Sequence, residues 1–348
     1  MRSYLSDIVG SKSLCRRIGE DIARGTFSHD YIIEGEEGSG KHTMARAIAM
    51  ALACENRRNE NEPLPCGHCK SCRKILSGNC PDLITVTKES NRTQFGVDVI
   101  RELRRDVPIL PNDLDFKIYL LEDAHLMNDA AQNAFLLTLE EPPPFVVFLL
   151  LANRSDVLLE TTRSRAPILR MQNVCDADMQ AYLLCEDRPA ISRAAKALQH
   201  ASPDEFSALI RMANGRIGRA LALLEEKKRA PLMAKREVAQ TLCTLLANGA
   251  QSANLLSLIC GMEKTREDTT SQLLFVQEAL RDLFALSCCD DAALTFFTDR
   301  ETALELATRF SAASLLTIIH ATDETLAALR NNANVRLTLI RYHQRLMA

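Results

Sequence analysis

The sequence has no surplus of basic residues and no long apolar run. Its 348 residues include 42 Lys and Arg against 45 Asp and Glu, a formal charge of −3 at pH 7. A protein that coats nucleic acid through many phosphate contacts carries surplus positive charge, so we expect any DNA contact to be local or shared with partners. The most apolar stretch, residues 145–152, is far shorter than the roughly 20 residues that cross a bilayer. No membrane association is expected.

No signal-peptide-like apolar segment follows Met1, so the expected location is cytoplasmic. The length predicts two or three domains, each with its own core. In that compartment, the 12 cysteines are expected to be thiols or metal ligands rather than disulfides. Eight of them are scattered, mostly within apolar helical patterns, where we expect them to pack as small apolar side chains. These are Cys15, Cys80, Cys175, Cys185, Cys243, Cys260, Cys288 and Cys289.

The other four cysteines form a compact pattern. They are Cys54, Cys66, Cys69 and Cys72. Three lie at intervals of three residues and the fourth ends a predicted helix, a spacing that suits four thiolates around one structural Zn²⁺. Unmetallated thiols and an iron–sulfur cluster are the alternatives, although the spacing to Cys80 is too long for the bacterial ferredoxin run. His68 could replace one sulfur, but Cys54 is the better fourth ligand.

A glycine-rich loop matches the phosphate-binding P-loop pattern. Gly35, Gly38, Gly40 and Lys41 follow a predicted strand at residues 30–34 and precede a predicted helix. Glycines let backbone amides turn toward phosphates, and the lysine reaches the β and γ oxygens. ATP is therefore the candidate ligand of this loop.

The residue after the lysine departs from the pattern. His42 has no hydroxyl to ligate Mg²⁺, and Thr43 is rotated by about 100° along the helix. An acidic pair, Glu122 and Asp123, ends a predicted strand at residues 117–121 in the reverse of the usual order. The shorter Asp123 leaves its carboxylate ~1.5 Å short of the position of a catalytic base, a misplacement that can cost ~10²-fold in rate. We expect ATP binding to survive better than turnover, and Mg²⁺ binding is in doubt.

Alternating strands and helices continue around this loop. Strands are predicted at residues 83–87, 145–151 and 167–171, and a helix over 97–107. Asn128 is expected to cap a helix over 129–141 that offers Ala130, Ala134, Leu137 and Leu139 for packing. Asn153 follows the strand at 145–151, where it is either a polar residue of the nucleotide pocket or a loop-forming asparagine.

Several segments carry a resemblance to a known family. They are residues 28–31 (Ser-His-Asp-Tyr), residues 79–83 (Asn-Cys-Pro-Asp-Leu), residues 133–142 (Asn-Ala-Phe-Leu-Leu-Thr-Leu-Glu-Glu-Pro), residues 162–166 (Thr-Arg-Ser-Arg-Ala) and the four-cysteine pattern. With these, the first 225 or so residues resemble the AAA+ module of bacterial DNA polymerase III clamp-loader subunits. Among these, the departures at His42 and Asp123 fit the delta-prime type better than the gamma/tau motor type. Ala166 and Cys80 also depart from the family pattern, at positions where we expect no consequence.

The resemblance implies an α/β AAA+ P-loop core with a parallel sheet, a small helical lid and an all-α collar. It places the core at residues 1–172 with the zinc module at 54–80, the lid at 173–227 and the oligomerisation collar at 228–348; the alternative for the last region is a monomeric helical bundle. It makes Arg165 an arginine finger for a neighbouring subunit's ATP, and Arg219 or Arg216 the second sensor. A finger supplied in trans is worth ~10³ to 10⁵ in rate.

The implied function is a largely non-hydrolysing delta-prime-like scaffold of the DNA polymerase III holoenzyme. Its implied partners are the gamma/tau and delta subunits, the sliding clamp and, through the assembly, primer-template DNA. An ATP-hydrolysing gamma/tau-like motor is the main alternative, and a zinc-dependent DNA reader is a further one.

Overall fold

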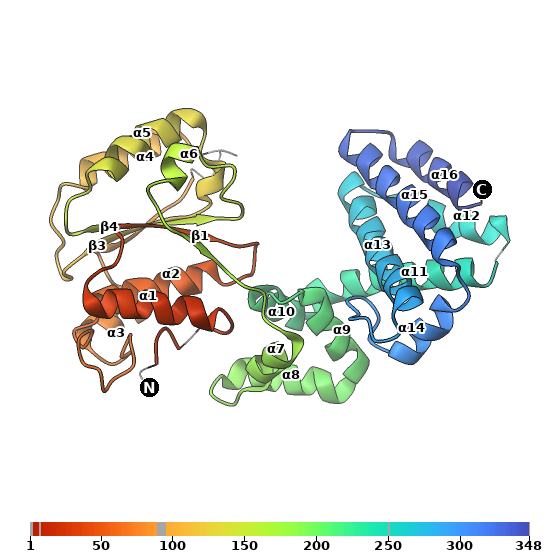
Figure 1. Cartoon of the computed structure of the whole chain (residues 1–348), viewed down its shortest axis with the longest axis horizontal. Coiled ribbons are helices and arrows are strands. Elements are labelled where there is room, and N and C mark those ends of the chain that lie inside the picture. Colours follow the sequence, from red (N-terminus) through yellow and green to blue (C-terminus); the bar gives the residue numbers. More distant parts are fainter. Residues whose placement is uncertain (1–2, 7, 89–94, 250, 348) are drawn as a thin grey trace. The chain divides into compact units, whose positions relative to one another are not determined.

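The computed structural model describes residues 3–6, 8–88, 95–249 and 251–347. The chain forms two compact units (Figure 1). Met1–Tyr182 and Gly215–Arg219 make up the first, and Leu183–Asn214 and Ala220–Ala348 the second. The division into core, lid and collar stays a prediction.

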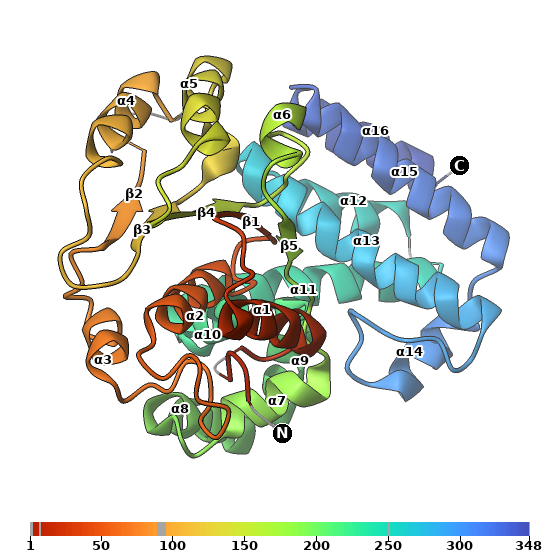
Figure 2. The ribbon, with the colours of Figure 1, turned by 60° about the vertical axis from the view of Figure 1, so that its left-hand side comes forward.

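The first unit is built on a five-stranded parallel sheet with the strand order β2-β3-β4-β1-β5 (Figure 2). The strands are β1 (Asp30–Glu34), β2 (Leu83–Val86), β3 (Lys117–Leu121), β4 (Val146–Ala152) and β5 (Ile168–Arg170). All five strands agree with the predicted ranges to within about two residues. Every residue of β3 and β4 is buried, which is why these strands read as continuous apolar runs.

Helices cover both faces of this sheet (Figure 1). α1 (Lys12–Arg24), α2 (Lys41–Ala53) and α3 (Lys70–Leu76) share one core layer with side chains such as Ile33 and Leu149. α4 (Val97–Asp106) and α5 (Asp129–Glu140) share the other with Ile32 and Phe148. Alternate residues of β1 and β4 therefore supply opposite layers, as the period of two in a strand requires. The short helices η1 (Ala124–Leu126) and α6 (Glu160–Arg163) belong to the connections.

Helix α5 begins as predicted, and its packing follows the prediction in part. The side chain of Asn128 accepts a hydrogen bond from the backbone N–H of Ala131 at 2.8 Å, which confirms the cap. Of the four residues predicted to pack, Leu139 is buried and Ala134 packs against the core, whereas Ala130 and Leu137 are exposed. The buried residues of the helix are Ala131, Gln132, Phe135, Thr138 and Leu139. Two of these are polar, so apolar spacing alone did not identify the whole buried face.

The rest of the described chain is helical. The helices are α7 (Asp176–Leu184), α8 (Pro189–Ala201), α9 (Pro203–Ala213), α10 (Ile217–Leu224), α11 (Glu226–Ala247), α12 (Ser252–Gly261), α13 (Arg266–Cys288), α14 (Arg300–Ala307), α15 (Ala312–Arg330) and α16 (Val335–Leu346). In the second unit α13 packs against α11, α14 and α15. The predicted α/β core with a parallel sheet, followed by an all-α region, is confirmed.

Within the described ranges, no single helix is long and apolar enough to span a bilayer. α14 and α15 have the length and apolar composition of a membrane span only when taken together, and they are bent by 102° where they meet.

The scattered cysteines only partly follow the prediction. Cys15, Cys80 and Cys243 are buried. The expectation of burial is wrong for the four exposed cysteines, because they lie near helix ends and loops rather than on buried helix faces. These are Cys175, Cys260, Cys288 and Cys289.

Asp30 is a buried acid at the start of β1. Its side chain is 6% exposed, and its Oδ1 atom has no hydrogen-bond partner within the described part of the chain. Burial raises the pKa of this carboxyl from 3.8 to about 7, while the nearby His29 opposes the rise. The folded state therefore favours the protonated acid. The contribution of protonated Asp30 to stability is full below the pKa that the carboxyl has in the unfolded chain, and it is lost as the pH rises toward 7.

We expect Asp30→Asn to stabilise the protein more at pH 8 than at pH 5, by ~2 kcal/mol in the free energy of unfolding. The asparagine stays neutral at both pH values, so only the wild-type chain has to ionise a buried group. Urea unfolding followed by circular dichroism measures the difference. An equal effect at both pH values would show that Asp30 titrates normally.

Candidate nucleotide site and cysteine cluster

The P-loop connects β1 to α2 at the carboxyl edge of the sheet. The backbone N–H of Gly35 donates to the carbonyl of Ala152 at 3.1 Å, so the loop starts beside the end of β4. Gly38 and Gly40 have φ values of 80° and 93°, a left-handed conformation that glycine adopts without steric cost. Gly40 is the N-cap of α2 and no side chain caps this helix. The first-turn N–H groups of α2 are thus suited to bind an anion.

Lys41 is buried at the centre of the loop. Its Nζ donates to the carbonyls of Gly35 at 2.6 Å and Glu36 at 3.0 Å, and to Oδ1 of Asn153 at 2.9 Å. These three acceptors match the three N–H groups of an ammonium. Burial lowers the pKa of Lys41, and the charge of Asp123 is the strongest influence opposing that shift. Lys41 therefore joins the P-loop to Asn153 at the end of β4.

His42 contacts Glu122 at the end of β3. Its Nε2 lies 3.0 Å from Oε1 of Glu122, with the side chains 62% and 32% exposed. In an active P-loop this region holds Mg²⁺ between a hydroxyl and an acidic residue. Here an imidazole takes the place of the hydroxyl and binds the carboxylate directly. Thr43 is exposed on the same helix turn.

His125 is a residue of this pocket to which the sequence analysis gave no role. Its ring nitrogens lie 3.3 Å from the backbone N and from Nδ2 of Asn153. Burial lowers the pKa of His125, which favours the neutral ring. Asp123 precedes it with φ 50°, a left-handed conformation that is uncommon for a residue with a side chain. In the sequence, the position of His125 in the acidic turn after β3 was the only indication that it belongs to this pocket.

The segment Gly215–Arg219 packs directly on the P-loop. The backbone N–H of Gly218 donates to the carbonyl of Gly38 at 2.8 Å. A Cβ atom on Gly38 would lie 2.8 Å from the backbone N of Arg219, so only glycine fits here. Arg216 forms an ion pair with Glu36 of the loop. Both arginines proposed as the second sensor therefore belong to a segment that contacts the loop, and Arg216 does so through its ion pair.

Arg165 lies just after α6 and contacts α5. Its guanidinium donates to Oε1 of Glu140 and to the carbonyl of Thr161, both at 2.9 Å. Its side chain is 37% exposed. The ion pair with Glu140 was not foreseen from the sequence, although Glu140 belongs to the Leu-Glu-Glu-Pro segment that carried part of the resemblance. The finger role of Arg165 stays a prediction.

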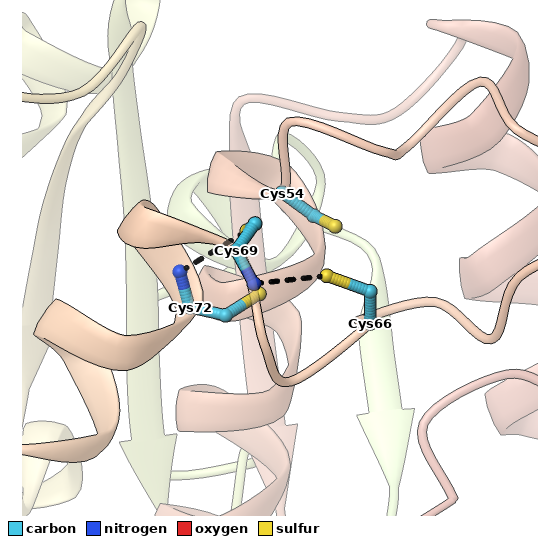
Figure 3. Close-up of side chains that lie close together, drawn as sticks. All are labelled: Cys54, Cys66, Cys69 and Cys72. Atoms are coloured by element: carbon cyan, nitrogen blue, oxygen red, sulfur yellow. Dashed lines mark hydrogen bonds between the residues drawn. The ribbon is translucent and has the colours of Figure 1, made fainter.

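The four cysteines converge between α2 and α3 (Figure 3). Cys54 is the C-cap of α2, Cys66 lies in the following loop, Cys69 is the N-cap of α3 and Cys72 lies in its first turn. Their sulfur atoms all lie within 4.8 Å of one another. A hydrogen bond from Cys72 lowers the pKa of the Cys54 thiol, so that sulfur is predisposed to be a thiolate.

These four sulfurs fit a tetrahedral metal ion. Zn–S bonds of ~2.3 Å in a tetrahedral site put neighbouring sulfurs ~3.8 Å apart. The four sulfur atoms of the cluster, all within 4.8 Å of one another, agree with this distance. Cys54, Cys69 and Cys72 are buried, and four sulfur ligands would fill all the positions of a tetrahedral ion. Glu62, Cys66 and His68 form a second, overlapping group of ligand atoms on the exposed side. The cluster can hold a metal ion, and the chemistry of four thiolates favours Zn²⁺ in a structural role.

Comparison with known sequences links part of the chain to DNA polymerase III. Residues 10–175, just under half of the chain, match the family model described as DNA polymerase III, delta subunit. DNA polymerase III subunit tau of Bacillus subtilis is 31% identical over 184 residues, 49% of this chain and 32% of that protein. Subunit gamma of Buchnera aphidicola is 32% identical over 180 residues, 52% of this chain and 48% of its own length. Subunit tau of Escherichia coli is 36% identical over 160 residues.

The chain spans about a third of the length of the Bacillus subtilis relative and about half of the length of the Buchnera aphidicola relative. Among solved structures, a gamma subunit-related protein of Thermotoga maritima aligns over 94% of this chain and 97% of its own, at 15% identity and a TM-score of 0.44. The RuvB branch migration motor of the same organism aligns over 90% of this chain and 87% of its own, at 14% identity and a TM-score of 0.42. The similarity to the gamma and tau subunits is therefore based on the sequence matches and not on these structural alignments.

We expect the purified chain to contain one tightly bound metal ion per molecule and Cys69→Ala to lose it. The variant should also unfold more readily, because metal binding in such clusters contributes to folding free energy. Metal content by plasma mass spectrometry and thermal unfolding measure the two effects. Cys260→Ala, at an exposed thiol outside the cluster, is the matched control. A full metal complement in Cys69→Ala would remove the cluster as the site.

Proposed function

We propose that this protein is a clamp-loader subunit of DNA polymerase III of the delta-prime type, acting in the cytoplasm. It joins a ring with gamma/tau- and delta-like subunits and helps to place the sliding clamp on primed DNA. Its own P-loop does not hydrolyse ATP at a useful rate, and Arg165 serves the ATP of a neighbouring subunit. Residues 173–227 act as a lid, residues 228–348 as a collar, and the four cysteines hold a structural Zn²⁺.

One observation carries the non-hydrolysing part of this proposal: the contact between His42 and Glu122. A P-loop ATPase needs a hydroxyl and an acidic side chain at Mg²⁺. The imidazole of His42 supplies no hydroxyl and lies 3.0 Å from the carboxylate. Mg²⁺ held at this position would stabilise the charge that develops on the transferring phosphoryl group, and His42 and Glu122 do not fit that ion.

The role of Arg165 is supported by its position and its accessibility. The side chain is held by one ion pair at the surface, with Glu140, whose own side chain is 47% exposed. Exposed ion pairs contribute little to stability, so a phosphate from another subunit can replace the carboxylate at small cost. Leu137, one turn before Glu140 on α5, is 60% exposed and offers an apolar contact beside the arginine.

We expect Arg165→Ala to lower ATP turnover at the site of the neighbouring subunit by ~10³-fold or more in a loader reconstituted with gamma/tau- and delta-type partners. The measurement is steady-state phosphate release in the presence of clamp and primed DNA. Arg24→Ala is the matched control, because Arg24 is also exposed and also pairs with a glutamate, Glu20.

Normal turnover by the Arg165→Ala loader, with the variant present at full stoichiometry, would contradict the finger role. Hydrolysis by this chain's own P-loop, lost on changing Lys41, would instead support the gamma/tau-like motor.

A further inference from the structure

The nucleotide site departs from an active P-loop in its metal position more than in its phosphate position. Gly38, Gly40 and the uncapped start of α2 keep the features that bind phosphate. The metal position is altered, since His42 and Glu122 are joined there at 3.0 Å. What the site binds therefore depends on how a nucleotide fits without the ion that normally accompanies it.

Mg²⁺ does not fit the groups that face this position. It prefers six oxygen ligands at 2.0–2.1 Å in near-octahedral geometry. His42 offers a nitrogen, a ligand type that suits transition metals better than Mg²⁺. For Mg²⁺ to bind, the carboxylate of Glu122 would have to break its contact with His42. The ion would gain no hydroxyl ligand in return. The metal would lose ligands that an active P-loop supplies.

The missing metal matters most for a third phosphate. In an active site the ion bridges the β and γ oxygens and screens them from nearby carboxylates. Here Glu122 lies at the metal position beside His42, Asp123 follows Glu122 directly in the chain, and Lys41 is the residue that reaches the β and γ oxygens. A γ-phosphate without a metal would meet the carboxylates of Asp123 and Glu122. A β-phosphate lies further back, over the loop amides and the N-terminus of α2.

We propose that this P-loop binds a nucleoside diphosphate without a metal ion and disfavours the triphosphate. The inference rests on the function proposed above in treating the loop as a site that has kept nucleotide binding. It goes further by naming the ligand class. The bound diphosphate replaces some of the acceptors that now surround Lys41, and the segment Gly215–Arg219, already tied to Gly38 and Glu36, closes over the loop.

The test is isothermal titration of the full chain with ADP and with ATP, each in EDTA and in Mg²⁺. ADP is expected to bind in EDTA, with an affinity that Mg²⁺ leaves unchanged within about twofold or lowers by competing for the phosphates. ATP is expected to bind about tenfold more weakly than ADP, from the repulsion of one or two unscreened charges. Lys41→Ala should abolish both.

Two substitutions at His42 isolate the metal position. His42→Thr restores the hydroxyl and should make ATP affinity rise about tenfold or more on adding Mg²⁺. His42→Val has nearly the same shape without the hydroxyl and should show no such gain. Because the His42 side chain is 62% exposed, both variants are expected to fold normally, which thermal unfolding checks.

Tighter wild-type binding of ATP with Mg²⁺ than of ADP would overturn the proposal. So would binding that requires Mn²⁺ or Zn²⁺, because His42 and Glu122 would then be ligands, and so would the absence of Lys41-dependent binding of either nucleotide. These outcomes are independent of the finger. A normal loader with Arg165→Ala contradicts the proposed function and leaves the diphosphate result standing.

Discussion

The parallel pairing of β1 with β4 is the constraint on which the candidate site depends. It sets Glu34 opposite Ala152, so the P-loop and Asn153 leave the sheet side by side. Pairing of β4 with β3 brings Glu122 to the same edge. The hydrogen bonds of Lys41 to Asn153 and of His42 to Glu122 follow from this register. A shift of one residue would turn the strand side chains to the other face of the sheet and displace Asn153 and Glu122, which follow the strand ends.

Local sequence patterns predicted most of the first unit. The strands were found because buried parallel strands are continuous apolar runs, and the P-loop because few residue types fit its backbone. The four cysteines were grouped correctly because a short spacing limits where their sulfurs can lie. The buried face of α5 was predicted only in part, since Gln132 and Thr138 are buried polar residues that apolar spacing cannot indicate.

Other contacts between distant parts of the chain, outside the P-loop pattern, were beyond sequence reasoning. The pairing of Arg165 with Glu140 and of Arg216 with Glu36 joins residues 25 and 180 positions apart. The approach of Gly218 to Gly38 depends on how the chain returns after α9. The position of His125 after the acidic pair was too weak a signal, because a histidine there is compatible with many roles. Such contacts depend on tertiary packing, which no local window contains.

The central claim is that the phosphate-binding half of this site is kept while its metal-binding half is lost. Phosphate release from ATP by the isolated chain, with Mg²⁺, clamp and primed DNA present, tests it most directly. The account predicts a rate at the background of a Lys41→Ala sample. Turnover well above that background, and abolished by Lys41→Ala, would contradict it.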